Sequence, residues 1–251
     1  MSVSRHYAID MCNGPLFGKI LTFALPIMAM NILQLLFNAA DMIVVGRFSG
    51  SEALAAIGAT GALINLIINF FMGLSVGTSV AVAQDYGADR LKEVSRSVHT
   101  SISISVVGGL LVMALGLVLC KPLLEMMGTP ADIIDLSTLY MKIYFLGVPA
   151  SMIYNFSAGI LRAVGDSRRP MYYLIIAGIL NVILNLFFVI VLRMSVDGVA
   201  WATIISQYLS MALILTCLLR SEGAIRLIPR QLRIDREKLG QIIRIGLPAG
   251  T

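Results

Sequence analysis

One acidic residue, Asp41, lies within a long apolar stretch and is the first candidate for chemistry in this sequence. Residues 20–46 contain no other charged side chain. A charged group near the centre of a membrane helix costs about 2.5–3.5 kcal/mol on insertion scales, so it usually faces a bundle interior or a wet cavity. Arg47 follows shortly, so the alternative is a helix end that reaches interfacial water. We expect the interior position, where Asp41 binds a cation or a proton.

Three amide side chains share a helix face with this carboxyl group. Asn31, Gln34, Asn38 and Asp41 are spaced by three, four and three residues, which forms one stripe on a helix. Four polar groups on one face of a membrane helix must point to other helices or to a water-filled cavity. Hydrogen bonding between helices would explain the amides, but it accounts poorly for the carboxylate. The stripe therefore predicts the lining of a substrate cavity.

Polar side chains on other apolar stretches are candidates to complete the site. Asn181 and Asn185 are four residues apart and share a helix face, and Thr203 and Gln207 repeat this spacing. Asn155 lies in a further stretch. We predict that Asn181, Asn185 and Thr203 bind the coupling cation, and that Asn155 and Gln207 line the cavity. Their oxygens suit a hard cation such as Na⁺ or a protonated carboxyl group. The alternative for each is packing between helices.

Pro26 is a candidate hinge in the first apolar stretch. Proline within a helix removes a backbone hydrogen bond and permits a kink. The alternative is a proline in the first turn, where it is harmless. His99 is a lone histidine near a predicted helix start, where we expect an interfacial position.

No set of side chains indicates enzyme chemistry or a bound cofactor other than a coupling ion. The three cysteines, Cys12, Cys120 and Cys217, are far apart and in no metal-ligand spacing. Neither a Ser/His/Asp nor a Cys/His set converges, and amide-lined cavities suit binding better than bond chemistry. We expect a protein that is not an enzyme.

Six long apolar stretches must position these residues. Hydrophobic residues make up 58% of the chain and charged residues 13%, about half the charge of a soluble domain. A membrane-spanning helix needs about 20 apolar residues. Stretches of this kind occupy residues 20–46, 53–84, 97–120, 143–161, 170–192 and 198–219. The first is too long for a cleavable signal peptide. We predict an all-α membrane protein with a bundle of six transmembrane helices.

Lysine and arginine are concentrated in alternate loops. Of 19 basic residues, 14 lie before the first stretch or in the loops that follow the second, fourth and sixth stretches. Basic loops stay in the cytoplasm, so residues 1–19 are predicted to be cytoplasmic in a multi-pass protein of the cytoplasmic (inner) membrane. This topology explains the net charge of +5 without a nucleic-acid partner.

The end of the chain contains a linker and a short internal repeat. Residues 220–238 mix Arg with Leu and Ile, which predicts a cytoplasmic linker on the membrane face; a solvated loop is the alternative. Gly240–Pro248 then repeats Gly18–Pro26 with Gly, Ile, Leu and Pro at one offset. A second copy after six spans enters the membrane in the same orientation, as in two-lobe transporters. We expect residues 20–219 to form one lobe, residues 239–251 to begin a truncated seventh helix, and the C-terminal lobe to be missing.

Five runs of residues resemble the MATE (multidrug and toxin extrusion) transporters. They are Gln34–Gly46, Gly73–Gly87, Gly159–Asp166 followed by Pro170, Asn181–Asn185 and Gly198–Thr203. The resemblance covers essentially the whole chain. It implies a twelve-helix fold of two lobes and antiport of organic cations against H⁺ or Na⁺. It places Asp41 at the ion site, and it places these residues around the lobe cavity: Gln34, Asn38, Asn155, Asn181, Asn185 and Thr203.

One position departs from the pattern of this family. Members of one prokaryotic branch carry Asp where this chain has Asn185. Asp41 is therefore expected to be the only carboxylate of the lobe cavity.

We expect a cation-coupled antiporter that exports organic cations and drugs. A carboxylate cannot hold an organic cation and a coupling ion equally well, and a ligand shifts a conformational equilibrium only through differential affinity. One alternative is a lipid-linked oligosaccharide flippase of a related fold. Its pyrophosphate cargo would favour Arg or Lys in the cavity, and the six stretches have none at their centres. The other alternative is a non-transporting membrane scaffold or half-transporter.

Overall fold

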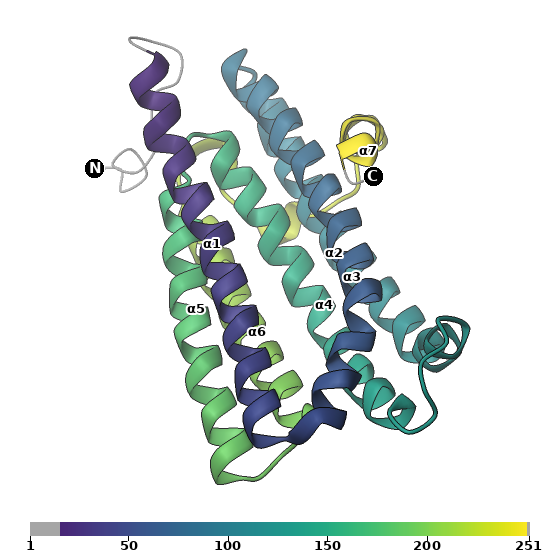
Figure 1. The fold of residues 1–251 in the computed structure, drawn as a ribbon. Coiled ribbons are helices and arrows are strands. Elements are labelled where there is room, and N and C mark those ends of the chain that lie inside the picture. The colour runs from purple at the N-terminus through teal and green to yellow at the C-terminus, as the bar shows by residue number, and fades with distance from the viewer. Residues whose placement is uncertain (1–15, 250–251) are drawn as a thin grey trace.

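The chain folds into a bundle of long helices in the computed structural model, which describes residues 16–249 (Figure 1). Predictions for residues 1–15 and 250–251, Cys12 among them, lie outside this range. Six helices of the described range are long and apolar enough to cross a membrane. They are α1 (Leu16–Phe48), α2 (Gly50–Gly87), α3 (Leu91–Met126), α4 (Ile134–Ala163), α5 (Arg168–Leu186) with its π-helical extension η2 (Phe187–Val191), and α6 (Val196–Arg220). The predicted all-α membrane fold is confirmed.

The helices are longer than the apolar stretches that predicted them. The 38 residues of α2 span about 57 Å at 1.5 Å per residue, whereas a bilayer core is about 30 Å thick. The helices continue past the apolar stretches because hydrogen bonds within a helix satisfy the backbone N–H and C=O groups in water as well as in lipid. Their polar ends therefore project beyond the membrane core and are available for contacts there.

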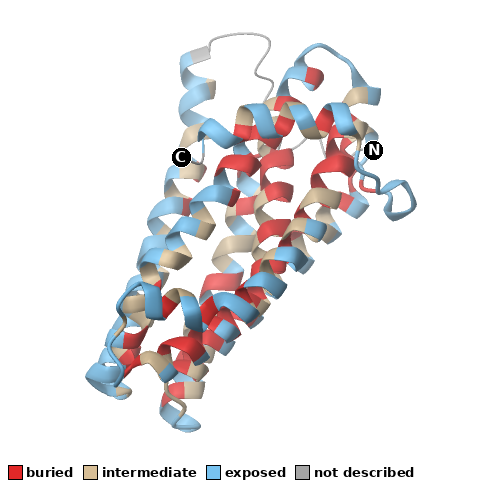
Figure 2. Cartoon of the chain, turned by 90° about the vertical axis from the view of Figure 1, so that its right-hand side faces the viewer, coloured by how far each residue is buried: buried red, intermediate tan, exposed pale blue. Residues whose placement is uncertain are grey.

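The helix α4 forms the centre of the bundle, and α1 lies at its edge. α4 packs against α2, α3 and α6. In its most apolar stretch of 18 residues, 72% is buried inside the structure, whereas the corresponding share for α1 is 11%. Figure 2 shows the same contrast between a buried interior and an exposed surface. α1 contacts mainly α5 and α2. α1 therefore has fewer packing partners than α4.

The segment after α6 ends in a helix that crosses the bundle. Two short 3₁₀ turns, η3 (Gly223–Ile225) and η4 (Pro229–Gln231), lead into α7 (Arg236–Ala249). In Figure 1, α7 is seen end-on, whereas α1 and α2 run along the picture. The helix packs against α2 and α3. In the described range α7 does not run alongside α1, so the start of a seventh membrane span stays a prediction.

Candidate functional site

Four of the predicted site residues form one hydrogen-bonded chain across three helices. Asn185 Nδ2 donates to Asp41 Oδ1 and also lies 3.3 Å from Asn181 Oδ1. Asn181 Nδ2 in turn lies 3.4 Å from Thr203 Oγ1. The helices α1, α5 and α6 are thus connected by this chain, which we call the Asp41 cluster.

The local packing of α1 on α5 explains why these residues meet. Asn181 and Asn185 lie on one face of α5, and both are buried. One turn earlier on that helix, a Cβ at Gly178 would overlap the ring of Phe37, so the aromatic side chain occupies the space that a larger residue would fill. Phe37 is one turn before Asp41 on α1. The contact sets the register that places Asp41 opposite Asn185.

The Asp41 cluster is polar but contains no compensating positive charge. Asp41 is half-buried and Asn185 is only 1% exposed. Within residues 16–249 Asp41 forms no ion pair. Asn185 Oδ1 is buried and has no hydrogen-bond partner among the described residues. A buried acceptor left without a donor costs about 1–3 kcal/mol, so the cluster combines an uncompensated carboxylate with an oxygen available to a ligand.

Two tyrosines of α4 belong to the surroundings of the site and were not predicted. Tyr140 is buried and close enough to Asp41 for a charge interaction, and it stacks on Tyr144 with ring centroids 6.3 Å apart. The side chain of Tyr144 lies close to that of Gln207 on α6. Spacing along the sequence relates residues within one helix only, so no sequence signal pointed to these tyrosines.

The remaining predicted residues lie apart from the Asp41 cluster. Asn31, Gln34 and Asn38 are exposed along α1. Asn155 Nδ2 donates to the Ser151 carbonyl of its own helix at 2.8 Å, so this amide does not join the cluster. The structure therefore separates a buried polar chain from an exposed amide stripe.

Pro26 lies inside α1 and is buried. It is ten residues after the helix start at Leu16, so it does not occupy the first turn. Ser167 Oγ donates to the nearby Phe23 carbonyl at 3.0 Å. A hinge at Pro26 remains a prediction.

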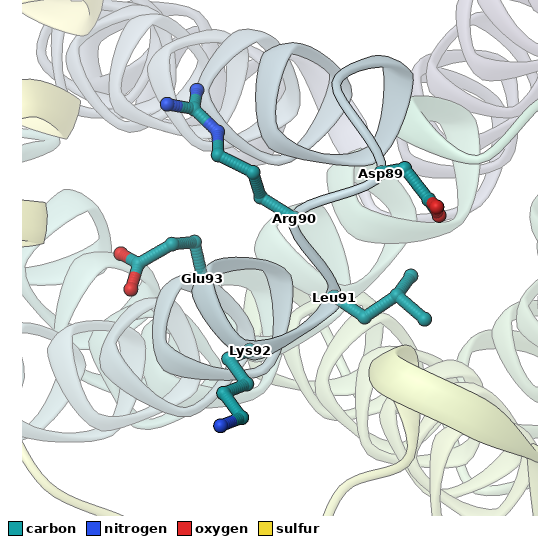
Figure 3. Close-up of a pocket in the computed structure, with 5 residues that line it drawn as sticks. All are labelled: Asp89, Arg90, Leu91, Lys92 and Glu93. Atoms are coloured by element: carbon teal, nitrogen blue, oxygen red, sulfur yellow. The ribbon is translucent and has the colours of Figure 1, made fainter.

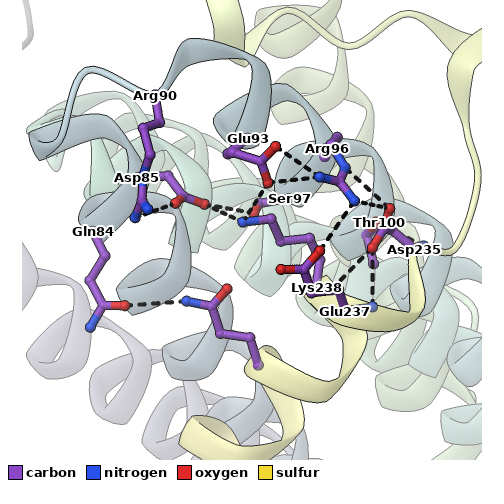
Figure 4. Close-up of polar contacts among 11 residues, drawn as sticks. Gln84, Asp85, Arg90, Glu93, Arg96, Ser97, Thr100, Asp235, Glu237 and Lys238 are labelled. Atoms are coloured by element: carbon purple, nitrogen blue, oxygen red, sulfur yellow. Dashed lines mark hydrogen bonds and ion pairs between the residues drawn. The ribbon is translucent and has the colours of Figure 1, made fainter.

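A second polar cluster joins α2, α3 and α7 at one end of the bundle (Figure 4). Lys238 Nζ lies 2.7 Å from Asp85 Oδ2 and 3.0 Å from Glu93 Oε2. Arg90 adds a second cation to Asp85 at 2.9 Å, and Arg96 links Glu93 to Asp235 at 2.8 and 2.7 Å. We call these six residues the ionic cluster. Sequence reasoning counted the basic ones as topology signals only.

Charge compensation keeps Lys238 ionised in a buried position. Lys238 is 4% exposed and Asp85 is 1% exposed. Burial alone would lower the pKa of Lys238, but hydrogen bonds to Asp85 and Glu93 outweigh it, so this pKa lies above its ordinary value. Buried charges persist when they are paired and hydrogen-bonded in this way.

Small residues bring the backbones of α2 and α7 together beside the ionic cluster. A Cβ at Gly246 would lie 2.8 Å from the Gly73 carbonyl oxygen and 2.8 Å from Leu74 Cα. A Cβ at Gly77 would overlap the Ile242 carbonyl oxygen. Gly-x-x-x-Gly patterns permit such close helix contacts. This crossing gives a structural reason for the glycines of the Gly73–Gly87 run.

His99 is buried against the linker near the start of α3, and its interfacial depth stays a prediction. It is 3% exposed. Its Nδ1 lies 2.7 Å from the Ser95 carbonyl, and its Nε2 accepts a hydrogen bond from the Ile228 N–H at 3.1 Å. The ring attaches the linker to α3.

The turn between α2 and α3 lines a shallow groove of about 400 Å³ (Figure 3). Its side chains, Asp89 to Glu93, point in different directions, and Arg90 and Glu93 belong to the ionic cluster. No three metal-ligating side chains of residues 16–249 are grouped to hold a metal ion. The groove lacks the convergent polar groups of a binding site.

Six membrane helices with α4 at their centre, and a polar cluster on the edge helix, define this chain as one lobe of a membrane transporter. The MatE family model matches residues 26–187, more than half of the chain. The chain belongs to the MatE family, whose relatives are multidrug efflux transporters.

Similar proteins support the assignment over almost the whole chain. The probable multidrug resistance protein YpnP of Bacillus subtilis (strain 168) is 30% identical over 243 residues, covering 97% of this chain and 54% of that protein. Crystal structures of MATE in the bent and straight conformations match with TM-scores of 0.86 and 0.85, both at 30% identity. Each match covers 92% of this chain and 52% of the solved chain. The chain thus spans about half the length of its relatives.

Proposed function

We propose that this chain supplies the N-terminal lobe of a cation-coupled antiporter that exports organic cations across the cytoplasmic membrane. Asp41 binds the coupling ion, H⁺ or Na⁺, and a second lobe outside this chain completes the cavity. The basic loops and the N-terminus face the cytoplasm. The observation that carries the proposal is the half-buried Asp41 carboxylate, which forms no ion pair within residues 16–249.

The oxygens around Asp41 suit a small cation. Asn185 Oδ1 is buried without a hydrogen-bond partner, and Asn181 and Thr203 supply further oxygens in the same chain of contacts. Hard cations prefer oxygen ligands of this kind. A proton on Asp41 would convert the carboxylate into a donor to a neighbouring oxygen. Either ion neutralises the only carboxylate of the cluster.

Neutralisation of Asp41 couples ion entry to substrate release. An organic cation in the cavity is attracted by the ionised carboxylate and loses that attraction once the coupling ion binds. The exposed amides Asn31, Gln34 and Asn38 lie on the same helix and line the path of the substrate. α1 is the least buried span, so Pro26 within it is placed to change the bend of α1 as the charge changes. Antiport requires this difference in affinity between the two states.

Transport by the full-length protein in proteoliposomes tests the proposal. An imposed Na⁺ gradient or pH gradient should drive accumulation or efflux of a fluorescent organic cation, and the effective gradient identifies the coupling ion. Asp41→Asn should abolish gradient-driven transport. The matched control is Asp132→Asn, which removes an exposed carboxylate. Normal transport by the Asp41→Asn protein would overturn the assignment, and transport of an anionic lipid-linked cargo instead would favour a flippase.

A further inference from the structure

The segment between α6 and α7 buries side chains near its start and exposes an outer face beyond them. We call residues 223–236 the basic linker. Ile225 and Leu227 are 9% and 5% exposed, whereas Arg226 and Ile228 face outward. The buried side chains join the apolar cluster formed by α2, α3, α4 and α6. Successive side chains of an extended chain point to opposite sides, so burial of Ile225 and Leu227 leaves Arg226 and Ile228 on the surface. The side chains of residues 229–234 are all exposed and continue this outer face.

Hydrogen bonds hold the basic linker against α3 and α6. The Leu227 N–H donates to the Leu218 carbonyl at 3.1 Å, and the Ile228 N–H donates to His99 at 3.1 Å. At the far end, the Asp235 N–H donates to Thr100 Oγ1 at 3.2 Å. The linker therefore has a defined conformation in which its outer face cannot turn inward.

Four arginines lie exposed on the outer face, and exposed apolar side chains alternate with them. The arginines are Arg226, Arg230, Arg233 and Arg236, and the apolar residues are Ile228, Leu232 and Ile234. The basic residues of the ionic cluster are paired with carboxylates, but no ion pair within residues 16–249 involves these four. The outer face thus carries uncompensated positive charge beside apolar groups.

We propose that the outer face of the basic linker binds anionic phospholipid headgroups of the adjacent membrane leaflet. The linker begins three residues after α6 ends at Arg220, which places it at the membrane surface. Clusters of basic residues next to a membrane span attract anionic lipid, and guanidinium groups bind phosphate through paired hydrogen bonds. Ile228, Leu232 and Ile234 enter the region between headgroups and acyl chains. The proposal rests on the membrane location and not on transport.

Native mass spectrometry of the full-length protein in neutral detergent measures this binding. The protein is titrated with phosphatidylglycerol, with phosphatidylcholine of the same acyl chains, and with glycerol phosphate. The wild-type protein should bind phosphatidylglycerol preferentially, and added salt should weaken the binding. A variant with glutamine at all four arginine positions should bind phosphatidylglycerol at least about tenfold less tightly. Each basic group near an anionic lipid surface contributes to the free energy of binding, and the variant loses four of them.

A matched variant removes the same charge at the opposite end of the bundle. Glutamine replaces the exposed residues Arg47, Lys121, Lys142 and Arg193 in this control, which should keep the wild-type affinity. A variant with lysine at the four linker positions retains the charge and should stay within a few-fold of wild type. Unchanged lipid preference in the glutamine linker variant would overturn the proposal. Equal losses in both glutamine variants, or equally tight binding of glycerol phosphate, would also overturn it.

Discussion

The two polar clusters of this lobe surround their carboxylates, Asp85 and Asp41, in opposite ways. Asp85 receives two cations, Lys238 at 2.7 Å and Arg90 at 2.9 Å, and a hydrogen bond from Ser97 Oγ at 3.3 Å. Asp41 receives one neutral amide donor. A carboxylate with saturated contacts has nothing left to offer a ligand, whereas an unsaturated one does. The first arrangement favours a permanent structural contact, and the second favours reversible binding.

The packing around the two clusters also differs, and it is tighter around the ionic cluster. The ionic cluster lies beside the crossing where the α2 and α7 backbones touch through glycines. The Asp41 cluster lies against α1, the least buried span of the described chain. Elements with few buried contacts open at lower free-energy cost than tightly packed ones. We expect conformational change to occur at α1 and not at the α2–α7 crossing.

The largest effect on stability is expected from Lys238→Met. The variant leaves Arg90 as the cation paired with Asp85 and removes a contact of Glu93. Breaking a buried ion pair costs about 3–5 kcal/mol, and the remaining Arg90 places this variant near the lower limit. Asp41→Asn should change the free energy of unfolding by less than about 1 kcal/mol, because no ion pair is lost.

Denaturant unfolding in detergent measures both variants. The double variant Asp85→Asn with Lys238→Met should recover part of the loss, because neither charge is then left buried alone. Equal losses for Lys238→Met and Asp41→Asn would remove the distinction between the clusters.

Gly246→Val should destabilise the α2–α7 crossing. Its Cβ would lie 2.8 Å from main-chain atoms of α2, and main chain cannot rotate away as a side chain can. Overpacking of this kind costs about 1–3 kcal/mol. Gly240→Ala is the matched control in the same helix, because nothing lies within 4 Å of its Cβ position. It should be neutral or gain up to about 1 kcal/mol from helix propensity. Equal unfolding midpoints for the two variants would contradict the close crossing.

Asn185→Ala should affect coupling more than folding. It removes the amide donor to Asp41 and the partnerless acceptor oxygen. Loss of a ligand contact to a charged group is worth about 1.5 kcal/mol or more, which corresponds to an ion concentration for half-maximal transport raised about tenfold. Ser151→Ala, beside Asn155 on α4, serves as a control away from the cluster. An unchanged ion dependence would exclude Asn185 from the site.

The smallest effect concerns the acid sensitivity of the linker. The hydrogen bond from Arg96 lowers the pKa of Asp235 below its ordinary value of 3.8. A carboxyl group with a lowered folded-state pKa stabilises the fold above the unfolded value and loses this contribution as the pH falls. Stability should therefore fall slightly as the pH drops below 3.8, and less so in Asp235→Asn.

Asp235→Asn keeps the N-terminus of α7 intact, so comparing this variant with the wild-type protein isolates the effect of the charge. Asp235 Oδ1 accepts hydrogen bonds from the Glu237 and Lys238 N–H groups, and asparagine caps a helix equally well. Thermal unfolding at a series of pH values measures the difference between the two proteins. Parallel pH profiles would show that the Arg96 contact adds nothing to stability.

The six spans and the shared face of Asn181 and Asn185 were predictable because they depend on composition and local periodicity. Apolar length indicates a membrane helix, and a spacing of four places two side chains on one side of it. The partners across helices were not predictable in this way. Tyr140 lies near Asp41 because α4 packs at the centre of the bundle. The contact between Asp85 and Lys238 joins residues 153 positions apart.

The sequence by itself determined that the chain enters lipid six times and that a single carboxylate within the first span needs a polar environment. Both conclusions follow from the free energy of placing side chains in a hydrocarbon solvent, which each segment experiences independently of the others. Only the tertiary structure decided that Asn185 is the amide that donates to Asp41 and that Lys238 meets carboxylates. Helix packing sets these pairings, because backbone contacts such as Gly246 on Gly73 fix the register between segments far apart in the chain.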